Sequence, residues 1–171
     1  MHHGNRLIRI LKHRWLDERD AQRAFGADGL ARLQALVKAS EHTHSGEIRV
    51  CVEAGLPLSY LWRKASPRER AVALFGKLGV WNTEANNGVL IYLLLAEHAI
   101  EIVADRGLSA RVPQAHWHEL LQGMRTEFRA GRFEAGLAQA IDAVGGELQR
   151  HFPLAPGQRN PNELPDMPNL R

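Results

Sequence analysis

The stretch EANNGVLIYLLLAEHAIEIVADRG, residues 84–107, decides the fold. Residues 89–95 are apolar or aromatic without interruption, but this run is far shorter than the roughly 20 residues that a membrane-spanning helix needs. An apolar run without alternation is typical of a central strand that is covered on both faces. After a short break at residues 96–98, the segment AIEIVAD partly alternates and is expected to be a neighbouring strand. Because the connection is so short, the two strands are predicted to form an antiparallel hairpin.

A further strand is predicted upstream of the hairpin. The segment EIRVCVE, residues 47–53, alternates with a period of two, and Ile48, Val50 and Val52 fall on one side. This pattern indicates a strand with one well-buried face.

A helix is predicted between this strand and the hairpin. Ser66 is suited to cap it, Pro67 fits the first helical position, and Glu69 completes a capping box. The expected buried stripe of this helix is formed by Val72, Phe75 and Leu78.

Strand, helix, strand, strand is an order that restricts the topology. A crossover connection makes the first two strands parallel with a right-handed turn in nearly all proteins, and the hairpin then adds the third strand antiparallel. The prediction is an α/β fold, a small mixed β-sheet sandwiched between α-helices, with a β-α-β-β core and flanking helices.

The rest of the chain divides into flanking segments. Further helices are predicted at residues 5–15, 17–25, 29–42, 113–129 and 132–151. From Pro153 onward, five prolines lie among polar residues, which predicts an extended or disordered segment. The expected organisation is an N-terminal helical extension over 1–26, an α/β domain over 27–152 and a Pro-rich flexible tail over 153–171.

The predicted topology brings sequence-distant polar segments to one edge of the sheet, where the first strand starts, the second starts and the third ends. The candidate ligands there are Glu84, Asn86, Asn87 and Asp105, with Glu47 as a further possibility. Carboxylate and amide oxygens are the ligands that hard cations such as calcium prefer. Arg106, at the same edge, is a candidate for binding an anion or another ligand.

Each of these residues also has a purely structural interpretation. Asn86 is suited to hold the turn before Gly88, and Asp105 is suited to cap a helical turn. Glu47 would then be an ordinary exposed strand residue. Both interpretations stay open at this point.

Composition narrows the class of protein. The 171 residues are 44% hydrophobic and 24% charged, as in an ordinary globular domain, and the formal net charge of +3 comes from arginines interspersed with acids. Nucleic-acid binding is therefore not expected. The lone cysteine, Cys51, lies in an apolar strand and indicates a reduced thiol and a cytoplasmic location. No secretory signal and no transmembrane segment are predicted.

The N-terminal segment is basic and amphipathic. Leu7, Ile10 and Leu11 can share one face of a helix, with Arg and Lys residues elsewhere. Either this helix packs on the domain, or it contacts an acidic membrane surface or a helix of a partner. The pair His2-His3 before it is either native or the remnant of a tag.

Four segments, in their order and spacing, resemble the TPM-domain family. They are SGEIRV, NTEANNGVLIYLLL, HAIEIVADRGL and FRAGRFEAGLAQAIDAV. The family is named for a thylakoid-lumen protein, a photosystem II repair factor and a receptor-modulating membrane protein. The resemblance covers roughly residues 27–152 and is closest to the small soluble bacterial branch.

This resemblance implies an α/β sandwich, with calcium binding in some members and acid phosphatase activity in a plant member. The ligand region of the family corresponds to Glu84, Asn86, Asn87, Asp105 and Arg106. Many relatives carry a Gly-aromatic-Gly-Leu turn where this chain has Asp-Arg-Gly-Leu at residues 105–108, which leaves the ligand chemistry open.

Known phosphatase signatures are absent from the sequence, which has neither a Cys-x5-Arg loop nor an Asp-x-Asp motif. The expected function is a non-catalytic binding module that holds calcium or another divalent cation and acts through a protein partner, plausibly a membrane-associated one. The alternative is a metal-dependent phosphatase of the TPM type.

Overall fold

The computed structural model describes residues 3–171, with side chains from Leu7 onward, so the question of His2 lies outside the described residues. One mixed sheet has the strand order β3-β2-β1-β4. β1 (Glu47–Glu53) is parallel to β2 (Gly88–Leu94), and β2 is antiparallel to β3 (Ala99–Ala104). The α/β fold with a β-α-β-β core is therefore confirmed.

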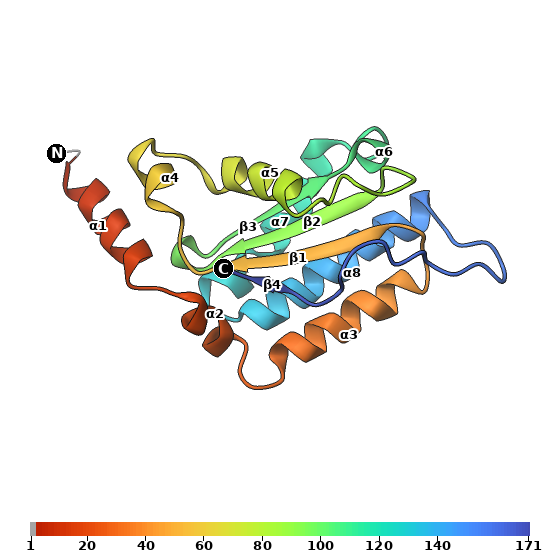
Figure 1. Ribbon diagram of the computed structural model, residues 1–171, viewed down its shortest axis with the longest axis horizontal. Helices are drawn as coiled ribbons and strands as arrows, with labels where there is room; N and C mark the ends of the chain where they lie inside the picture. Colours follow the sequence, from red (N-terminus) through yellow and green to blue (C-terminus); the bar gives the residue numbers. More distant parts are fainter. Residues whose placement is uncertain (1–2) are drawn as a thin grey trace.

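Helices cover both faces of the sheet (Figure 1). They are α1 (His3–Arg14), α2 (Glu18–Ala24), α3 (Gly29–Glu41), α4 (Leu58–Trp62), α5 (Pro67–Lys77), α6 (Arg106–Ser109), α7 (Gln114–Arg129) and α8 (Phe133–His151), with a 3-10 turn at Leu95–Glu97. Residues of α2, α3, α7 and α8 pack in the larger hydrophobic cluster, on one face. Residues of α4 and α5 pack in the smaller cluster, on the other face.

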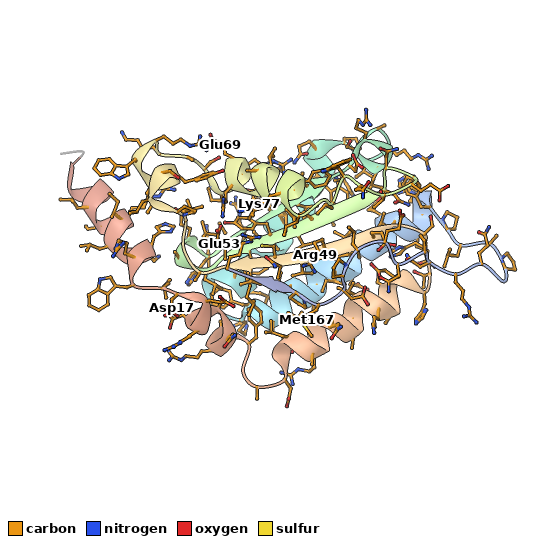
Figure 2. All side chains as sticks on the ribbon, in the orientation of Figure 1. Asp17, Arg49, Glu53, Glu69, Lys77 and Met167 are labelled. Atoms are coloured by element: carbon orange, nitrogen blue, oxygen red, sulfur yellow. The ribbon has the colours of Figure 1, made fainter. Side chains whose placement is uncertain are left out.

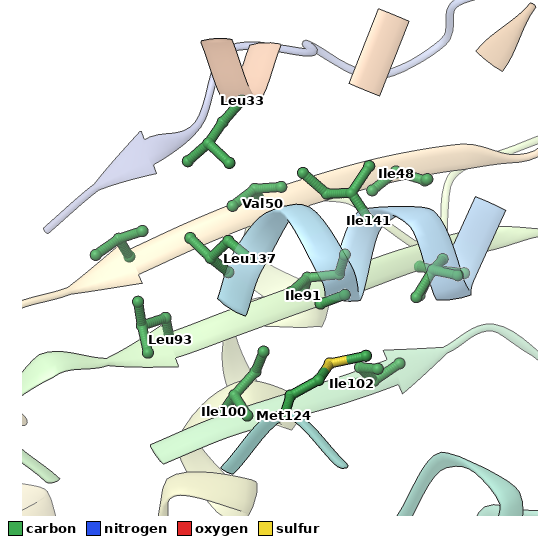
Figure 3. Packing of buried hydrophobic residues seen from close by; sticks show 14 of the residues in the cluster. Leu33, Ile48, Val50, Ile91, Leu93, Ile100, Ile102, Met124, Leu137 and Ile141 are labelled. Carbon is green, nitrogen blue, oxygen red and sulfur yellow. The ribbon is translucent and has the colours of Figure 1, made fainter. Parts of the chain in front are cut away.

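The larger cluster contains the predicted inner face of β1. Ile48 and Val50 lie in it together with Ile91 of β2 and with Leu137 and Ile141 of α8 (Figure 3). All five side chains are almost completely removed from solvent. Burial of such side chains stabilises the fold by about 1.5–3 kcal/mol each, before the loss of conformational entropy is subtracted.

The other face of β1 is also buried, which differs from the single buried face that the alternation predicts. Arg49 donates hydrogen bonds to the backbone oxygens of Pro165 and Met167 (Figure 2). Glu53 forms an ion pair with Arg70 of α5. Polar residues can occupy a covered strand face when their polar groups find partners. The alternation in the sequence therefore predicted which side of β1 is polar, but it did not predict that this side is buried.

The partners of Arg49 belong to residues 153–171, here called the C-terminal strap. The strap returns along the sheet and ends in β4 (Asn169–Leu170), which is parallel to β1 (Figure 1). Leu164 of the strap is buried with 8% of its surface exposed, and the backbone of Arg171 exchanges hydrogen bonds with Val52 and Ala54. The segment expected to be flexible is thus packed on the sheet, because its few apolar side chains and its backbone groups find partners there.

The helix after β1 has the predicted start. Ser66 and Glu69 form the expected capping box, and proline stands at the first turn of α5. The predicted stripe is wrong in part, since Val72 is 51% exposed while Ala71 and Leu74 are fully buried. The small side chain of Ala71 lets the helix face the sheet through a neighbouring stripe.

Among residues 3–171, no helix is both long enough and apolar enough to span a bilayer.

Candidate cation site at the sheet edge

The predicted polar edge is present, and its centre is a row of three residues. Glu47 lies opposite Gly88 in the parallel register, and the backbone N–H of Asp105 donates to the oxygen of Gly88 at 2.9 Å. Glu47 and Asp105 therefore flank Gly88, one from the start of β1 and one from the end of β3. Residues in one row of a sheet project to the same face, and two strand spacings separate these two by about 10 Å at the Cα atoms.

Two turns meet at this edge and fix the position of Asp105. The backbone N–H of Gly107 donates to the oxygen of Asn86 at 2.8 Å. A Cβ atom on Gly107 would lie only 2.5 Å from that oxygen, so the close approach requires glycine. Asn86 itself has a φ of 51°, a left-handed conformation that asparagine tolerates, and holds the turn as its structural interpretation expects.

Asp105 combines a structural role with an unused oxygen. Its Oδ1 accepts a hydrogen bond from the backbone N–H of Arg106 at 2.7 Å, which caps α6. Its Oδ2 is buried and has no hydrogen-bond partner. A buried acceptor without a donor is costly, so this oxygen is a natural ligand for a cation.

Glu47 is completely buried, so its interpretation as an exposed strand residue is wrong. Its Oε2 accepts a hydrogen bond from the backbone N–H of Leu164 at 3.1 Å, while its Oε1 has no partner. Burial raises the pKa of Glu47, backbone hydrogen bonds of the strap oppose the shift, and the carboxylates of Glu163 and Asp166 add to it. A bound cation would relieve the same unfavourable charge.

Asn87 carries a third buried oxygen without a partner. Its backbone N–H donates to the hydroxyl of Thr83 at 3.1 Å, and its Nδ2 lies 3.4 Å from the hydroxyl of Ser45. Its Oδ1 is buried and unpaired. Because side chains alternate along a strand, Asn87 is expected on the face opposite to the row of Glu47, Gly88 and Asp105.

Glu84 and Arg106 lie on the rim rather than in the buried part of the edge. Glu84 is exposed, and its backbone N–H donates to the carboxylate of Glu163 at 3.1 Å. Arg106 is exposed, and its Nη2 lies 3.4 Å from Oδ1 of Asn86. The structure thus brings Asn86, Asp105 and Arg106 together and leaves Glu84 beside the strap.

Three further acidic residues near the edge were not predicted from the sequence. They are Glu41, Glu163 and Asp166. Asp166 is 6% exposed, and its Oδ2 lies 4.0 Å from Nζ of Lys38. Glu41 is 5% exposed, at the end of α3. Two of the three lie in the strap. The sequence feature that could have predicted the packing of the strap is Leu164, an apolar residue among polar ones.

The available donors suit a hard cation better than a transition metal. Among the side chains that the structure describes, from Leu7 onward, no three of His, Cys, Asp or Glu converge in a way that could hold a metal ion. The unpartnered oxygens in the row of Glu47, Gly88 and Asp105 instead come from two carboxylates, and carboxylate oxygens are ligands that calcium prefers. The backbone oxygen of Val80 also lies over Gly88, where a Cβ would approach it to 2.1 Å.

The fold and this edge define a class, namely α/β domains whose β-α-β-β core ends in an oxygen-rich sheet edge. A model of the TPM domain matches residues 19–147, most of the chain. The chain belongs to the TPM-domain family. No curated protein matches it.

Two solved structures are similar to this chain. The BA42 protein of the psychrophilic bacterium Bizionia argentinensis, solved by NMR, superposes with a TM-score of 0.72 at 27% identity, and the match covers 85% of this chain and 94% of BA42. The N-terminal domain of a protein from P. gingivalis superposes with a TM-score of 0.62 at 20% identity, over 78% of this chain and 85% of that domain. The second likeness concerns the fold alone.

Proposed function

We propose that the chain is a non-catalytic TPM-type binding module that holds a divalent cation, calcium by its ligand chemistry, at the sheet edge. One observation supports the proposal above the others. Glu47 and Asp105 share one row of the sheet and each carries a buried carboxylate oxygen without a hydrogen-bond partner, while the unpaired oxygen of Asn87 belongs to the opposite face. A cation at the carboxylates of Glu47 and Asp105 would satisfy two of these oxygens and cancel buried negative charge.

The rim supplies a way for the cation to act on a protein partner. Glu84 and Arg106 are exposed, and Glu163 of the strap bonds the backbone of Glu84. Occupation of the edge changes the net charge that this surface presents, so a partner, plausibly one at a membrane, would sense the cation electrostatically. The proposal places the module in the cytoplasm, where the buried free thiol of Cys51 stays reduced.

The test is calcium-dependent stabilisation. Calcium should raise the melting temperature of the wild type, because a ligand that binds only the folded state stabilises it. Asp105→Asn should abolish this rise, yet asparagine still caps α6, so the variant should remain folded. Asp28→Asn removes the same charge from an exposed position and should keep the wild-type response.

A wild-type melting temperature that does not change with calcium, magnesium or manganese would remove the cation from the proposal. The partner is tested separately by affinity capture with calcium and with a chelator. A partner that is retained equally in both, or equally by Asp105→Asn, is not regulated by this edge.

The alternative is a metal-dependent phosphatase, in which a metal at the same edge supplies an activated water. The exposed guanidinium of Arg106, close to Asp105, is the observation that favours it, because arginine binds phosphate well. Hydrolysis of para-nitrophenyl phosphate by the metal-supplemented protein, lost in Asp105→Asn and reduced in Arg106→Gln, would establish this function in place of the binding module.

A further inference from the structure

The N-terminal helix α1 docks on the domain through Arg9, Ile10 and His13. Nε of Arg9 donates to the carboxylate of Glu97 at 2.7 Å, and Nη2 of Arg9 donates to the oxygen of Ala65 at 2.9 Å. His13, whose side chain is fully buried, lies 3.0 Å from the same carboxylate and accepts a hydrogen bond from the backbone N–H of Leu56. Ile10 packs against the smaller hydrophobic cluster between these polar contacts. The helix therefore has a defined position, which Arg9, Ile10 and His13 fix together.

The apolar side of α1 faces outward as a consequence. Leu7, Ile8, Leu11 and Trp15 expose 64%, 65%, 56% and 83% of their surfaces. Leu7, Ile8 and Leu11 lie on one side of α1, and Trp15, directly after the helix, continues this stripe because its N–H still donates to the oxygen of Leu11 at 3.1 Å. An amphipathic helix normally buries such a stripe against its own domain, and an exposed apolar patch of this kind marks an interaction site.

Charge indicates what covers this stripe. The helix has no acidic residue from His3 to Arg14, and the exposed Lys12 and Arg14 border the apolar side chains. The first acid of the chain is Asp17, which is used to cap α2. A stripe of leucine, isoleucine and tryptophan that is flanked by cations is complementary to a bilayer surface, where negatively charged headgroups lie over an apolar interior.

The position of the helix agrees with such a surface. α1 extends from one end of the molecule next to α4, and α6 lies at the opposite end of the sheet (Figure 1). α4 exposes Leu58 at 43% beside it. The stripe can therefore lie flat on a surface without covering the cation edge.

We propose that α1 is an interfacial helix that binds the surface of anionic bilayers, with Leu7, Ile8, Leu11 and Trp15 between the lipid headgroups and Lys12 and Arg14 on their phosphates. Four apolar side chains give weak, reversible binding, so the contact depends on both the lipid charge and the salt concentration. This inference is independent of the cation edge.

Sedimentation of the full chain with vesicles tests the proposal, with a chelator present so that calcium cannot bridge protein and lipid. The wild type should pellet with vesicles that contain phosphatidylglycerol, much less with pure phosphatidylcholine, and less at high salt. Leu7→Ser with Leu11→Ser should lose most of the pelleted fraction. Lys12→Gln with Arg14→Gln should lower it to the level seen with phosphatidylcholine.

A matched control replaces apolar residues that are exposed elsewhere. Leu36→Ser with Val72→Ser changes side chains that are 42% and 51% exposed on α3 and α5, and this variant should pellet like the wild type. Melting curves of all variants show that each is folded.

Two results would overturn the proposal. One is a wild type that stays in solution with anionic vesicles, or that pellets equally after the substitutions in α1. The other is a dimer, seen by light scattering and lost in Leu7→Ser with Leu11→Ser, without vesicle binding, which would assign the stripe to a second copy of the chain.

Discussion

Glu41 shows how strongly one buried carboxyl can respond to its surroundings. Its Oε1 accepts a hydrogen bond from the backbone N–H of Ile48 at 3.0 Å. Burial raises its pKa to about 8, the hydrogen bond from Ile48 opposes the shift, and the carboxylates of Glu47 and Asp166 reinforce it. The folded chain therefore keeps a proton on Glu41 that the unfolded chain releases near its ordinary pKa of 4.5.

The direction of the pH effect follows from this difference in bound protons. Stability contributed by protonated Glu41 is complete below pH 4.5 and is lost as the pH rises to about 8. Burial lowers the pKa of His44 from 6.5 to about 4, so its contribution changes mostly below pH 6.5 and in the opposite sense. Between pH 6.5 and 8 the contribution of Glu41 therefore outweighs that of His44.

We expect the free energy of unfolding of the wild type to fall by on the order of 1–2 kcal/mol between pH 6.5 and 8. Glu41→Gln keeps an acceptor for Ile48 without an ionisable proton, so its stability should change much less. Urea unfolding at both pH values measures this, with the exposed Glu119→Gln as control. An equal slope in Glu41→Gln and the wild type would contradict the assignment.

At the residue scale, the sequence predicted where the polar edge of the sheet lies but not how deeply its acidic residues are buried. It placed Asp105 beside Asn86 because topology alone brings the two turns together, and the structure confirms that placement. Whether a cation binds there stays a prediction. It missed Glu41 and Asp166, because the burial of a charged residue depends on which distant segment covers it, and no local pattern records that.

The packing of α3 against α8 leaves no room for a side chain at one of two adjacent glycines in α8. A Cβ on Gly145 would lie 2.1 Å from Oγ of Ser40, whose hydroxyl is itself 2.9 Å from Nε2 of His44. A Cβ on Gly146 would meet nothing within 4 Å. Both residues lie inside α8, so helix propensity acts equally on the two and steric contact separates them.

Gly145→Ala should therefore lower the free energy of unfolding by about 1–3 kcal/mol, because the helices must move apart or Ser40 must turn away. Gly146→Ala should raise it by up to about 1 kcal/mol, since alanine is the better helix former. Thermal unfolding of both variants compares the two signs. Shifts of the same sign and size would mean that the helices pack less tightly than the structure shows.

At the element scale, long periodic segments were predicted well and short ones were not. β1 has the predicted bounds, and the capping box of α5 fixes its start where Ser66 indicated. α6 was expected only as a helical turn capped by Asp105, and α4 and β4 were missed, because elements of two to five residues are formed by tertiary contacts rather than by a repeating pattern.

For the molecule as a whole, the C-terminal strap connects the sheet to its polar edge. Arg49, 8% exposed on β1, donates to two backbone oxygens of the strap, and Glu47 accepts from the N–H of Leu164. The strap thus covers the buried carboxylate of the proposed site. Its attachment should depend on Arg49, since the guanidinium group of this one residue binds two backbone oxygens of the strap.

We expect Arg49→Met to loosen the strap while the domain stays folded. Amide hydrogen exchange in the peptide that contains residues 160–171 should become clearly faster, and exchange in α8 should not change. The exposed Arg129→Met provides the matched control. Unaltered exchange in residues 160–171 would show that β4 and Leu164 hold the strap without Arg49.

At this scale, the order of strands and the covering of the sheet could be predicted, because a crossover followed by a hairpin allows few arrangements. The docking of the strap could not. Its proline-rich composition is typical of flexible segments. The contacts that make it ordered, with the backbone of β1 and with the side chains of Arg49 and Glu47, are not revealed by the sequence of the strap itself.

Cys51 faces Asn169 of β4 in register, and its Sγ lies 3.7 Å from Oδ1 of that residue. Burial raises the pKa of the thiol to about 12, so neither protonation state nor access favours alkylation while the edge is closed. The single thiol can therefore be used to measure how often this part of the sheet opens. The rate at which iodoacetamide labels this single thiol measures how often the segments that cover it open, with β4 among them, and a slower rate with calcium would link that opening to the cation.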